Sequence, residues 1–90
     1  MPNQPFTPVS FTTFGDLLKY LRRREQLTQL EFSITVGYSE AQISRLEQNQ
    51  RLPDLAVLKA LFIPALHLEN ESELTNRFLE LAQSARQEDA

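Results

Sequence analysis

The sequence of 90 residues predicts an all-α fold, a compact bundle of about five short helices. Three observations support this prediction. Apolar residues recur with the i, i+3, i+4 spacing of a helix face, and polar residues that cap helices precede these runs. No stretch of the sequence carries a convincing strand pattern. A chain of this length suits a single domain with one core.

The first helix is expected after a proline-rich start. Residues 1–11 contain three prolines and no helical period, so we expect a flexible arm there. Thr13 then offers a hydroxyl for a helix N-cap, and Asp16 places an acid in the first turn. The helix should run to about Gln26. Its buried stripe is expected to consist of Phe14, Leu17, Leu18 and Leu21.

Two capping boxes predict the next two helices. The segments Thr28–Glu31 and Ser39–Gln42 each place a hydroxyl at the cap and a Glu or Gln at the third helical position. Gly37, between the boxes, suits the left-handed backbone that commonly ends a helix. We therefore expect a short second helix that stops at Gly37 and a third helix that ends near Asn49.

Two further helices are expected in the C-terminal half. Asp54 caps a fourth helix, which Pro64 ends or kinks, and Asn70 with Glu73 caps a fifth. The apolar face of the fourth helix is expected to consist of Val57, Leu58, Leu61 and Phe62. That of the fifth is expected to consist of Leu74, Phe78, Leu81, Ala82 and Ala85. This last stripe is interpreted as core, with a dimer contact as the alternative.

The second and third helices together predict a helix-turn-helix. Ser33 is small where the two helices approach, and Gly37 supplies the tight turn. The apolar residues that hold the pair together are Phe32, Val36, Tyr38, Ile43 and Leu46. In this motif the second helix is presented to the major groove of DNA. We therefore predict specific binding of double-stranded DNA by the helix that starts after Ser39.

These expectations divide the chain into four parts. They are an N-terminal arm (1–11), a helix-turn-helix domain (12–68), a C-terminal amphipathic helix (69–86) and a frayed tail (87–90). The net charge of −3 is unevenly spread along them. Residues 14–63 carry seven basic and six acidic side chains, whereas residues from 64 onward carry two basic and six acidic ones. If the protein binds DNA, the acidic C-terminal part should face away from it.

Several other functions find no support in the sequence. There is no cysteine, and His67 is the only histidine, so we expect no metal site and no cofactor. No nucleophile and base are arranged for catalysis, so we expect no catalytic residues and no enzyme activity. The longest apolar run, Ala60–Leu66, is too short to span a membrane. Without a secretory signal at the start, the expected location is the cytoplasm.

The motif residues resemble a known family, the lambda-repressor/Cro-like helix-turn-helix domains, also called xenobiotic-response-element-type regulators. The segments Leu27–Gln29, Gly37–Ser39 and Ile43–Glu47 carry most of this resemblance, which extends from Phe14 to about Leu68. It implies a five-helix domain that binds operators, usually as a homodimer.

The resemblance also implies roles for individual residues. Gln29 would contact phosphate and steady a recognition side chain, and Arg22 and Glu47 would form a structural pair between the first and third helices. Asn49 stands where the family commonly has glycine. The family's base-facing positions are occupied by Glu40, Ala41, Ser44 and Arg45.

Each candidate DNA contact has a structural alternative. Arg45 could bind guanine through two hydrogen bonds or be a surface or phosphate-binding arginine. Glu40 could accept a hydrogen bond from cytosine or only stabilise the helix N-terminus. Ala41 offers a contact to a thymine methyl group. Ser39 and Gln42 could approach DNA or act as caps, and Asn49 and Arg51 could grip phosphate or belong to an ordinary polar loop.

Two alternatives concern the protein as a whole. Its acidic composition favours a protein-interaction module that keeps the fold without DNA binding. The segment Arg45–Leu81 is also similar to the N-terminal domain of large bacterial regulators that carry an NTPase module, which would imply further domains of a longer chain. The run Arg22–Arg24 is interpreted as mostly structural, because cations favour the C-terminal end of a helix.

Overall fold

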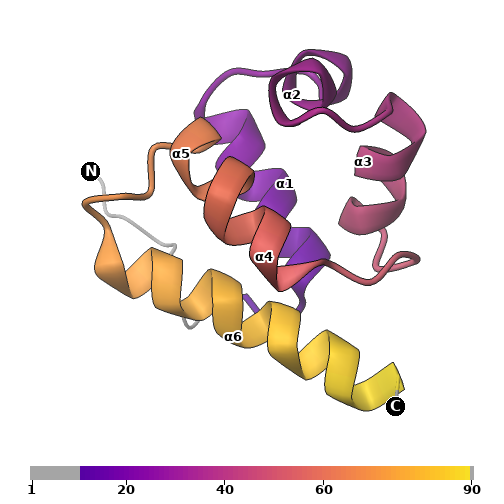
Figure 1. Cartoon of the computed structure of the whole chain (residues 1–90), viewed down its shortest axis with the longest axis vertical. Helices are drawn as coiled ribbons and strands as arrows, with labels where there is room; N and C mark the ends of the chain where they lie inside the picture. Colours follow the sequence, from indigo (N-terminus) through magenta and orange to yellow (C-terminus); the bar gives the residue numbers. More distant parts are fainter. Residues whose placement is uncertain (1–10, 90) are drawn as a thin grey trace.

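Helices and the turns between them make up the computed structural model, which describes residues 11–89; all but the last residue of the expected arm (1–11) lies outside this range (Figure 1). The helices are α1 (Phe14–Arg24), α2 (Gln29–Val36), α3 (Glu40–Glu47), α4 (Leu55–Val57), the π-helical segment η2 (Leu58–Phe62), α5 (Ile63–Ala65) and α6 (Ser72–Asp89). Because α4, η2 and α5 form one continuous stretch, the described chain contains five helical units and no strand. The all-α prediction is confirmed.

Helix α1 occupies the centre of the bundle. It packs against α3 and α6, while α2 packs mainly against α3. Figure 1 shows α6 on the opposite side of the bundle from α2. Helix α1 therefore separates the acidic C-terminal helix from α2.

One hydrophobic core joins all the helical units. Two aromatic pairs lie within it, Phe14 with Phe78 and Phe32 with Phe62, with ring centroids 4.9 and 5.1 Å apart. The remaining buried apolar side chains are Leu17, Leu18, Leu21, Val36, Ile43, Leu46, Leu58, Leu66, Leu68, Leu81 and Ala82. The stripe expected on the last helix is therefore core, with Leu74 and Ala85 half-buried at its edge. It is not available as a dimer contact.

The first four helical units end in the same way. A residue with positive φ follows each helix, at Gln26, Gly37, Asn49 and His67. The N–H of the next residue then donates to the carbonyl five residues back, as in Leu27 to Arg22 at 3.2 Å. The sequence predicted this conformation only for the glycine and the asparagine. The first helix consequently stops at Arg24, two residues earlier than expected.

The fourth helical unit differs from the regular α-helix that we expected. The N–H of Ile63 donates to the carbonyl of Leu58, which makes η2 a π-helical turn directly before Pro64. A proline ring displaces the carbonyl four residues back, so a widened turn accommodates it. The helix continues through Pro64 to Ala65. The prediction that Leu61 lies on the buried face is wrong, because the wider turn rotates it into solvent, where 44% of it is exposed.

Both borders of the C-terminal helix differ from expectation. The carbonyl of Glu71 accepts the N–H of Thr75 at 2.9 Å, and the first helical residue is Ser72. The cap position thus falls on Glu71, and the prediction of Asn70 is wrong. At the other end the helix continues through Asp89 rather than ending at residue 86. None of the helices between residues 11 and 89 has the length and apolar character needed to cross a membrane.

The N-terminal segment is anchored earlier than expected. Phe11 lies 5.1 Å from Tyr20 between ring centroids and packs against the core. Its carbonyl accepts a hydrogen bond of 2.7 Å from Arg77 on α6. The arm that we expected to reach residue 11 therefore cannot extend beyond residue 10.

Candidate nucleic-acid interface

The helix-turn-helix is built by local capping and a left-handed glycine. In both boxes the hydroxyl, of Thr28 or of Ser39, accepts from the N–H three residues on, and the Glu31 or Gln42 side chain accepts from the cap's own N–H. Gly37 has φ = 77°, a backbone conformation that strains any other residue except, to a lesser extent, Asn or Asp. These contacts fix where α2 ends and where α3 begins.

The four predicted base-facing residues lie on α3 at i, i+1, i+4 and i+5, which places them on one side of the helix. Glu40, Ala41 and Arg45 are exposed, and Ser44 is half-buried. The Arg45 side chain has no hydrogen-bond or ion-pair partner between residues 11 and 89. The Ser44 hydroxyl accepts a hydrogen bond of 2.9 Å from the Gln48 side chain. Among residues 11–89, the outer side of α3 thus presents one cation and one acid that no other side chain binds.

Ser39 and Gln42 are already engaged with each other. The Ser39 hydroxyl accepts from the Gln42 N–H at 3.1 Å, and the Gln42 carbonyl oxygen accepts from the Ser39 N–H at 2.9 Å. Their capping role is therefore present without a ligand. The amide nitrogen of Gln42 and the O–H of Ser39 are left to donate to a partner.

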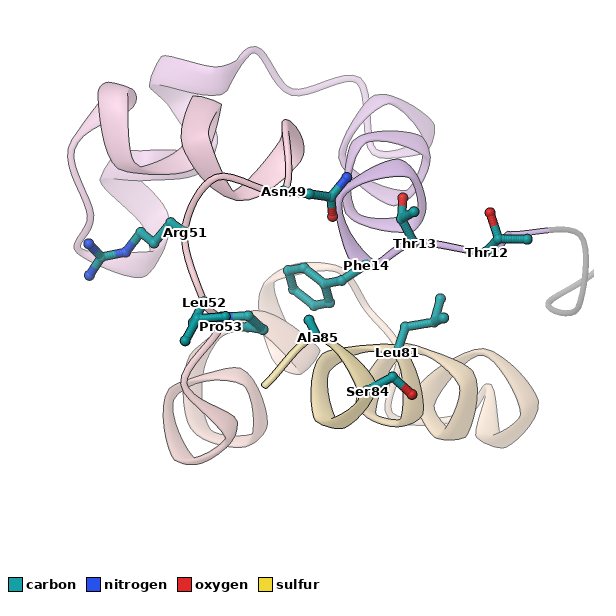
Figure 2. A pocket seen from close by; sticks show the side chains of 10 residues that line it. All are labelled: Thr12, Thr13, Phe14, Asn49, Arg51, Leu52, Pro53, Leu81, Ser84 and Ala85. Atoms are coloured by element: carbon teal, nitrogen blue, oxygen red, sulfur yellow. The ribbon is translucent and has the colours of Figure 1, made fainter. Parts of the chain in front are cut away.

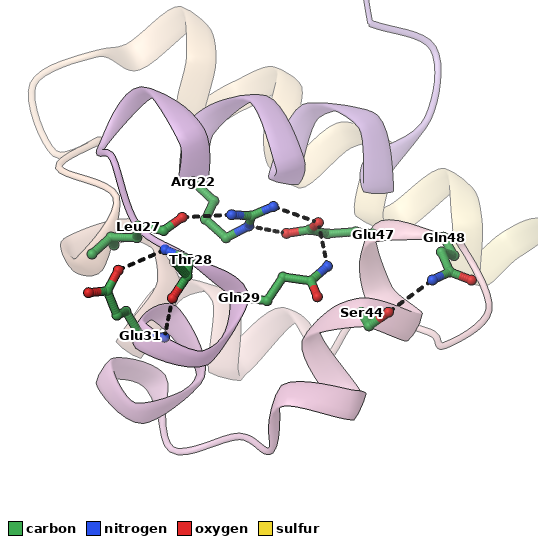
Figure 3. A network of polar contacts seen from close by, with 8 residues as sticks. All are labelled: Arg22, Leu27, Thr28, Gln29, Glu31, Ser44, Glu47 and Gln48. Carbon is green, nitrogen blue, oxygen red and sulfur yellow. Dashed lines mark hydrogen bonds and ion pairs between the residues drawn. The ribbon is translucent and has the colours of Figure 1, made fainter.

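A buried polar cluster lies beneath α3 (Figure 3). The guanidinium of Arg22 binds both carboxylate oxygens of Glu47, at 2.5 and 3.1 Å, and donates to the carbonyl of Leu27 at 2.6 Å. The Gln29 amide donates to the same carboxylate at 3.0 Å. The Arg22 and Glu47 side chains are only 9% and 3% exposed. The cluster thus joins α1, α2 and α3 at one point.

The place of Gln29 differs from what the family resemblance implied. Its amide donates to the buried carboxylate of Glu47, and within residues 11–89 no hydrogen bond joins it to the exposed side chains of α3. Gln29 therefore supports the recognition helix through the cluster beneath it. Its contact with phosphate stays a prediction.

Asn49 also turns inward, toward the start of α1. Its φ is 60°, and its side-chain oxygen accepts the N–H of Gly15 at 2.9 Å. A Cβ atom on Gly15 would lie 2.3 Å from the carbonyl oxygen of Glu47, which is closer than real Cβ contacts occur. The close packing of Gly15 was not predicted from the sequence. The available signal was a glycine in the first turn of a helix, where it weakens the helix by itself.

Arg51 lies in the loop after α3 and is exposed. Its guanidinium carbon lies 5.6 Å from the centroid of the Tyr38 ring, a cation–π arrangement. Tyr38 is half-buried and packs edge-on against Phe62 at 5.5 Å. The loop after α3 thus returns to the turn that precedes it, and the tyrosine ring holds the arginine there.

A half-open pocket of about 340 Å³ lies between the start of α1, the loop after α3 and α6 (Figure 2). Phe14 stands at its centre, and the Arg51 side chain extends away from it. The other lining residues are Thr12, Thr13, Asn49, Leu52, Pro53, Leu81, Ser84 and Ala85. The pocket lies behind the loop, not on the outer side of α3.

The three consecutive arginines of α1 have different surroundings. Arg22 is buried in the polar cluster, and Arg23 is exposed. Arg24 binds both oxygens of Glu71 at 2.9 Å and the carbonyl of Leu66 at 3.2 Å. The hydrogen bonds to Glu71 raise the pKa of Arg24 above its ordinary value. Two of the three arginines are therefore internal connectors.

His67, the single histidine, binds the Glu25 side chain at 2.7 Å. Between residues 11 and 89, no three or more His, Cys, Asp or Glu side chains are grouped so that they could hold a metal ion.

The comparison with protein families gives one match. A family model described as a helix-turn-helix domain matches residues 13–62, more than half of the chain. The matched range begins at the cap of α1 and ends with η2, and so it includes the capping boxes and the buried cluster. No curated protein and no solved structure matches the chain.

Proposed function

Because the chain belongs to the helix-turn-helix domain family, we propose that it binds a specific double-stranded DNA sequence as a transcriptional regulator, or as the DNA-binding part of one. The observation that carries this proposal is the outer side of α3. Arg45 is exposed and unpartnered there within the described chain, on a helix whose opposite side is fixed by a buried ion pair. A free cation on a firmly held helix is suited to reading base edges in the major groove.

The side chains suggest how bases would be read. Arg45 would donate two hydrogen bonds to guanine O6 and N7, the commonest specific contact in the major groove. Glu40, in the first turn of α3, would accept from the amino group of cytosine. Ala41 would lie against a thymine methyl group, and the Ser44 hydroxyl would supplement these contacts.

Phosphate contacts would position the domain on the duplex. We assign them to Arg51, which the Tyr38 ring holds beside the turn, and to the N-terminal ends of α2 and α3 at Gln29 and Ser39. The acidic helix α6 lies on the other side of the bundle, where its charges repel DNA least.

The proposal extends to the lambda-repressor/Cro-like subtype. The pair Arg22–Glu47 supports it, since the resemblance implied this pair and the two side chains form it. That subtype usually binds as a homodimer. Because the domain carries little net positive charge, a second copy would add affinity for DNA. With seven basic and six acidic residues in positions 14–63, one domain would discriminate sequence better than it grips DNA. Further domains of a longer cytoplasmic chain could supply the same extra affinity.

Binding to mixed-sequence duplex DNA at increasing salt concentration tests the proposal. The logarithm of the affinity should fall linearly with the logarithm of the salt concentration, because bound phosphates release counterions. The measurement should include the protein fused to a dimerising segment, so that a weak monomer is not missed. Absence of binding at low salt in both forms would overturn the proposal.

A second function, a protein-interaction module, is favoured by one specific observation. Leu30 and Ile34 lie one turn apart on α2 and are 51% and 72% exposed, in a chain whose net charge is −3. Substituting both by Ser would leave DNA binding intact if α3 carries the function. If the same salt series shows no DNA binding, this alternative becomes the preferred function.

A further inference from the structure

The start of α1 meets the end of α3 in an unusually close contact. The N–H of Gly15 donates to the Asn49 side chain at 2.9 Å, and an added Cβ on Gly15 would lie 2.3 Å from the Glu47 carbonyl oxygen and 2.8 Å from that of Leu46. Figure 2 shows the Asn49 side chain directed toward the first turn of α1. Backbone therefore lies directly on backbone at this junction.

Within residues 11–89, the junction is the second of two polar attachments between α1 and the end of α3. The other is the ion pair of Arg22 with Glu47. Gly15 and Arg22 lie seven positions apart on α1, about two turns or roughly 10 Å along its axis. A helix held at one point can pivot about it, whereas two separated points fix its direction. The pair of attachments therefore sets the angle at which α3 leaves α1.

Asn49 meets two requirements, of which glycine would meet only one. The position needs a positive φ, which glycine adopts most readily. It also needs a side-chain acceptor for the N–H of Gly15, which glycine lacks. Asparagine tolerates the left-handed backbone and supplies the oxygen.

We propose that Asn49 and Gly15 are positioning residues, which set the orientation of α3 for DNA recognition without touching the DNA. This inference rests on the proposed function. It gives Asn49 an internal role in place of the phosphate contact considered from the sequence. A small rotation of α3 displaces Arg45 and Glu40 from the base edges while leaving phosphate contacts largely in place. Loss of the junction should therefore reduce discrimination between sequences more than it reduces affinity for DNA in general.

Two substitutions of Asn49 separate the possibilities. Asn49→Gly keeps the backbone conformation and removes the oxygen, whereas Asn49→Asp keeps an acceptor for the N–H of Gly15. The affinity of each variant is measured for a duplex recovered by selection and for a mixed-sequence duplex, together with its melting temperature. We expect Asn49→Gly to lower the ratio of the two affinities about two- to tenfold and to lower the melting temperature. Asn49→Asp should retain the wild-type ratio and melting temperature.

A direct DNA contact by Asn49 predicts a different pattern. Both affinities would then fall by the same factor in Asn49→Gly, with no change in melting temperature, and would fall further in Asn49→Asp, because a carboxylate repels phosphate. That result, or an unchanged ratio in Asn49→Gly, would overturn the inference. If the wild-type protein binds neither duplex, it is the proposed function that fails.

Gly15→Ala examines the junction from the other side. A methyl group there must push the end of α3 away, because its nearest neighbours are backbone atoms that cannot move independently. We expect the affinity ratio to fall as in Asn49→Gly. If Gly15→Ala does not fold, the two Asn49 variants still decide the question.

Discussion

The two ends of α3 are held in different ways. At the C-terminal end, Glu47 binds Arg22 and Gln29, and Asn49 binds Gly15, so that polar contacts join α1, α2 and α3, with the Arg22–Glu47 pair buried. At the N-terminal end, the polar contacts of the cap within residues 11–89 are local, between Ser39 and its own first turn. The residues that follow the cap are mostly exposed.

This difference separates the helix into a part that is held and a part that is free to bind. Buried, mutually satisfied polar groups are costly to disturb, whereas exposed side chains on a rigid helix can be changed with little effect on folding. Substitutions at the C-terminal end should therefore reduce stability. Substitutions on the exposed N-terminal part should alter DNA binding and leave the fold intact.

The largest effect is expected when the buried pair is broken. Glu47→Ala leaves Arg22 charged and unpaired at a site where its side chain is 9% exposed, which should cost about 3–5 kcal/mol of unfolding free energy. Urea denaturation measures this loss. The matched control is Glu80→Ala, whose carboxylate is 65% exposed and pairs with Arg77; it should cost about 0–1 kcal/mol. Equal losses of unfolding free energy in the two variants would contradict the inference that the buried pair fixes the C-terminal end of α3.

The next effect concerns discrimination between sequences. Arg45→Ala should lose about 1–3 kcal/mol of preference for the selected duplex over mixed DNA, since the guanine contact disappears. The melting temperature should remain close to that of the wild type, because the side chain is exposed and unpartnered within residues 11–89. Competition binding with both duplexes gives the preference. Arg23→Ala, an exposed arginine on α1, is the control of equal charge and should leave the preference unchanged.

A smaller effect is expected at the cap of α3. Ser39→Ala removes the acceptor for the Gln42 N–H and should cost about 1 kcal/mol of stability. Ser39→Asp keeps an acceptor and should restore most of the loss. Thermal unfolding followed by circular dichroism distinguishes the variants. A loss as large as that of Glu47→Ala would mean that the two ends of α3 are held equally firmly.

The smallest effect is expected for the phosphate contact. Arg51→Ala should weaken binding to all sequences alike. The slope of the logarithm of affinity against the logarithm of salt concentration should fall by about one, because one phosphate contact is lost. Arg51→Lys should retain the slope, because it retains the charge. Salt titrations of both variants provide the comparison. A change in sequence preference after Arg51→Ala would show that this loop reads bases.

Most of the fold could be predicted because its signals are local. The capping boxes at Thr28 and Ser39, and the left-handed Gly37, each depend on residues within one turn. The apolar spacing of α1 likewise predicted its buried stripe, from Phe14 to Leu21. These signals also placed the exposed and buried sides of α3.

The differences from expectation arise where tertiary packing determines the structure. Gln26 and His67 adopt positive φ, although neither residue is a glycine or an asparagine, the types from which this conformation is predicted. Leu61 was misplaced because spacing alone does not reveal a π-helical turn before a proline. Neither the contact between Gly15 and Asn49 nor the hydrogen bond from Arg77 to the Phe11 carbonyl could be predicted, since each joins residues at least 34 positions apart.

Selection of bound duplexes from a random pool tests the central claim, that the outer side of α3 reads a DNA sequence. We expect the wild-type protein to enrich one short sequence that contains a guanine, and the Arg45→Ala variant to lose the selection for that guanine. A palindromic product would in addition report a two-fold symmetric dimer. Recovery of a pool with no sequence preference, from folded protein at low salt, would contradict the account.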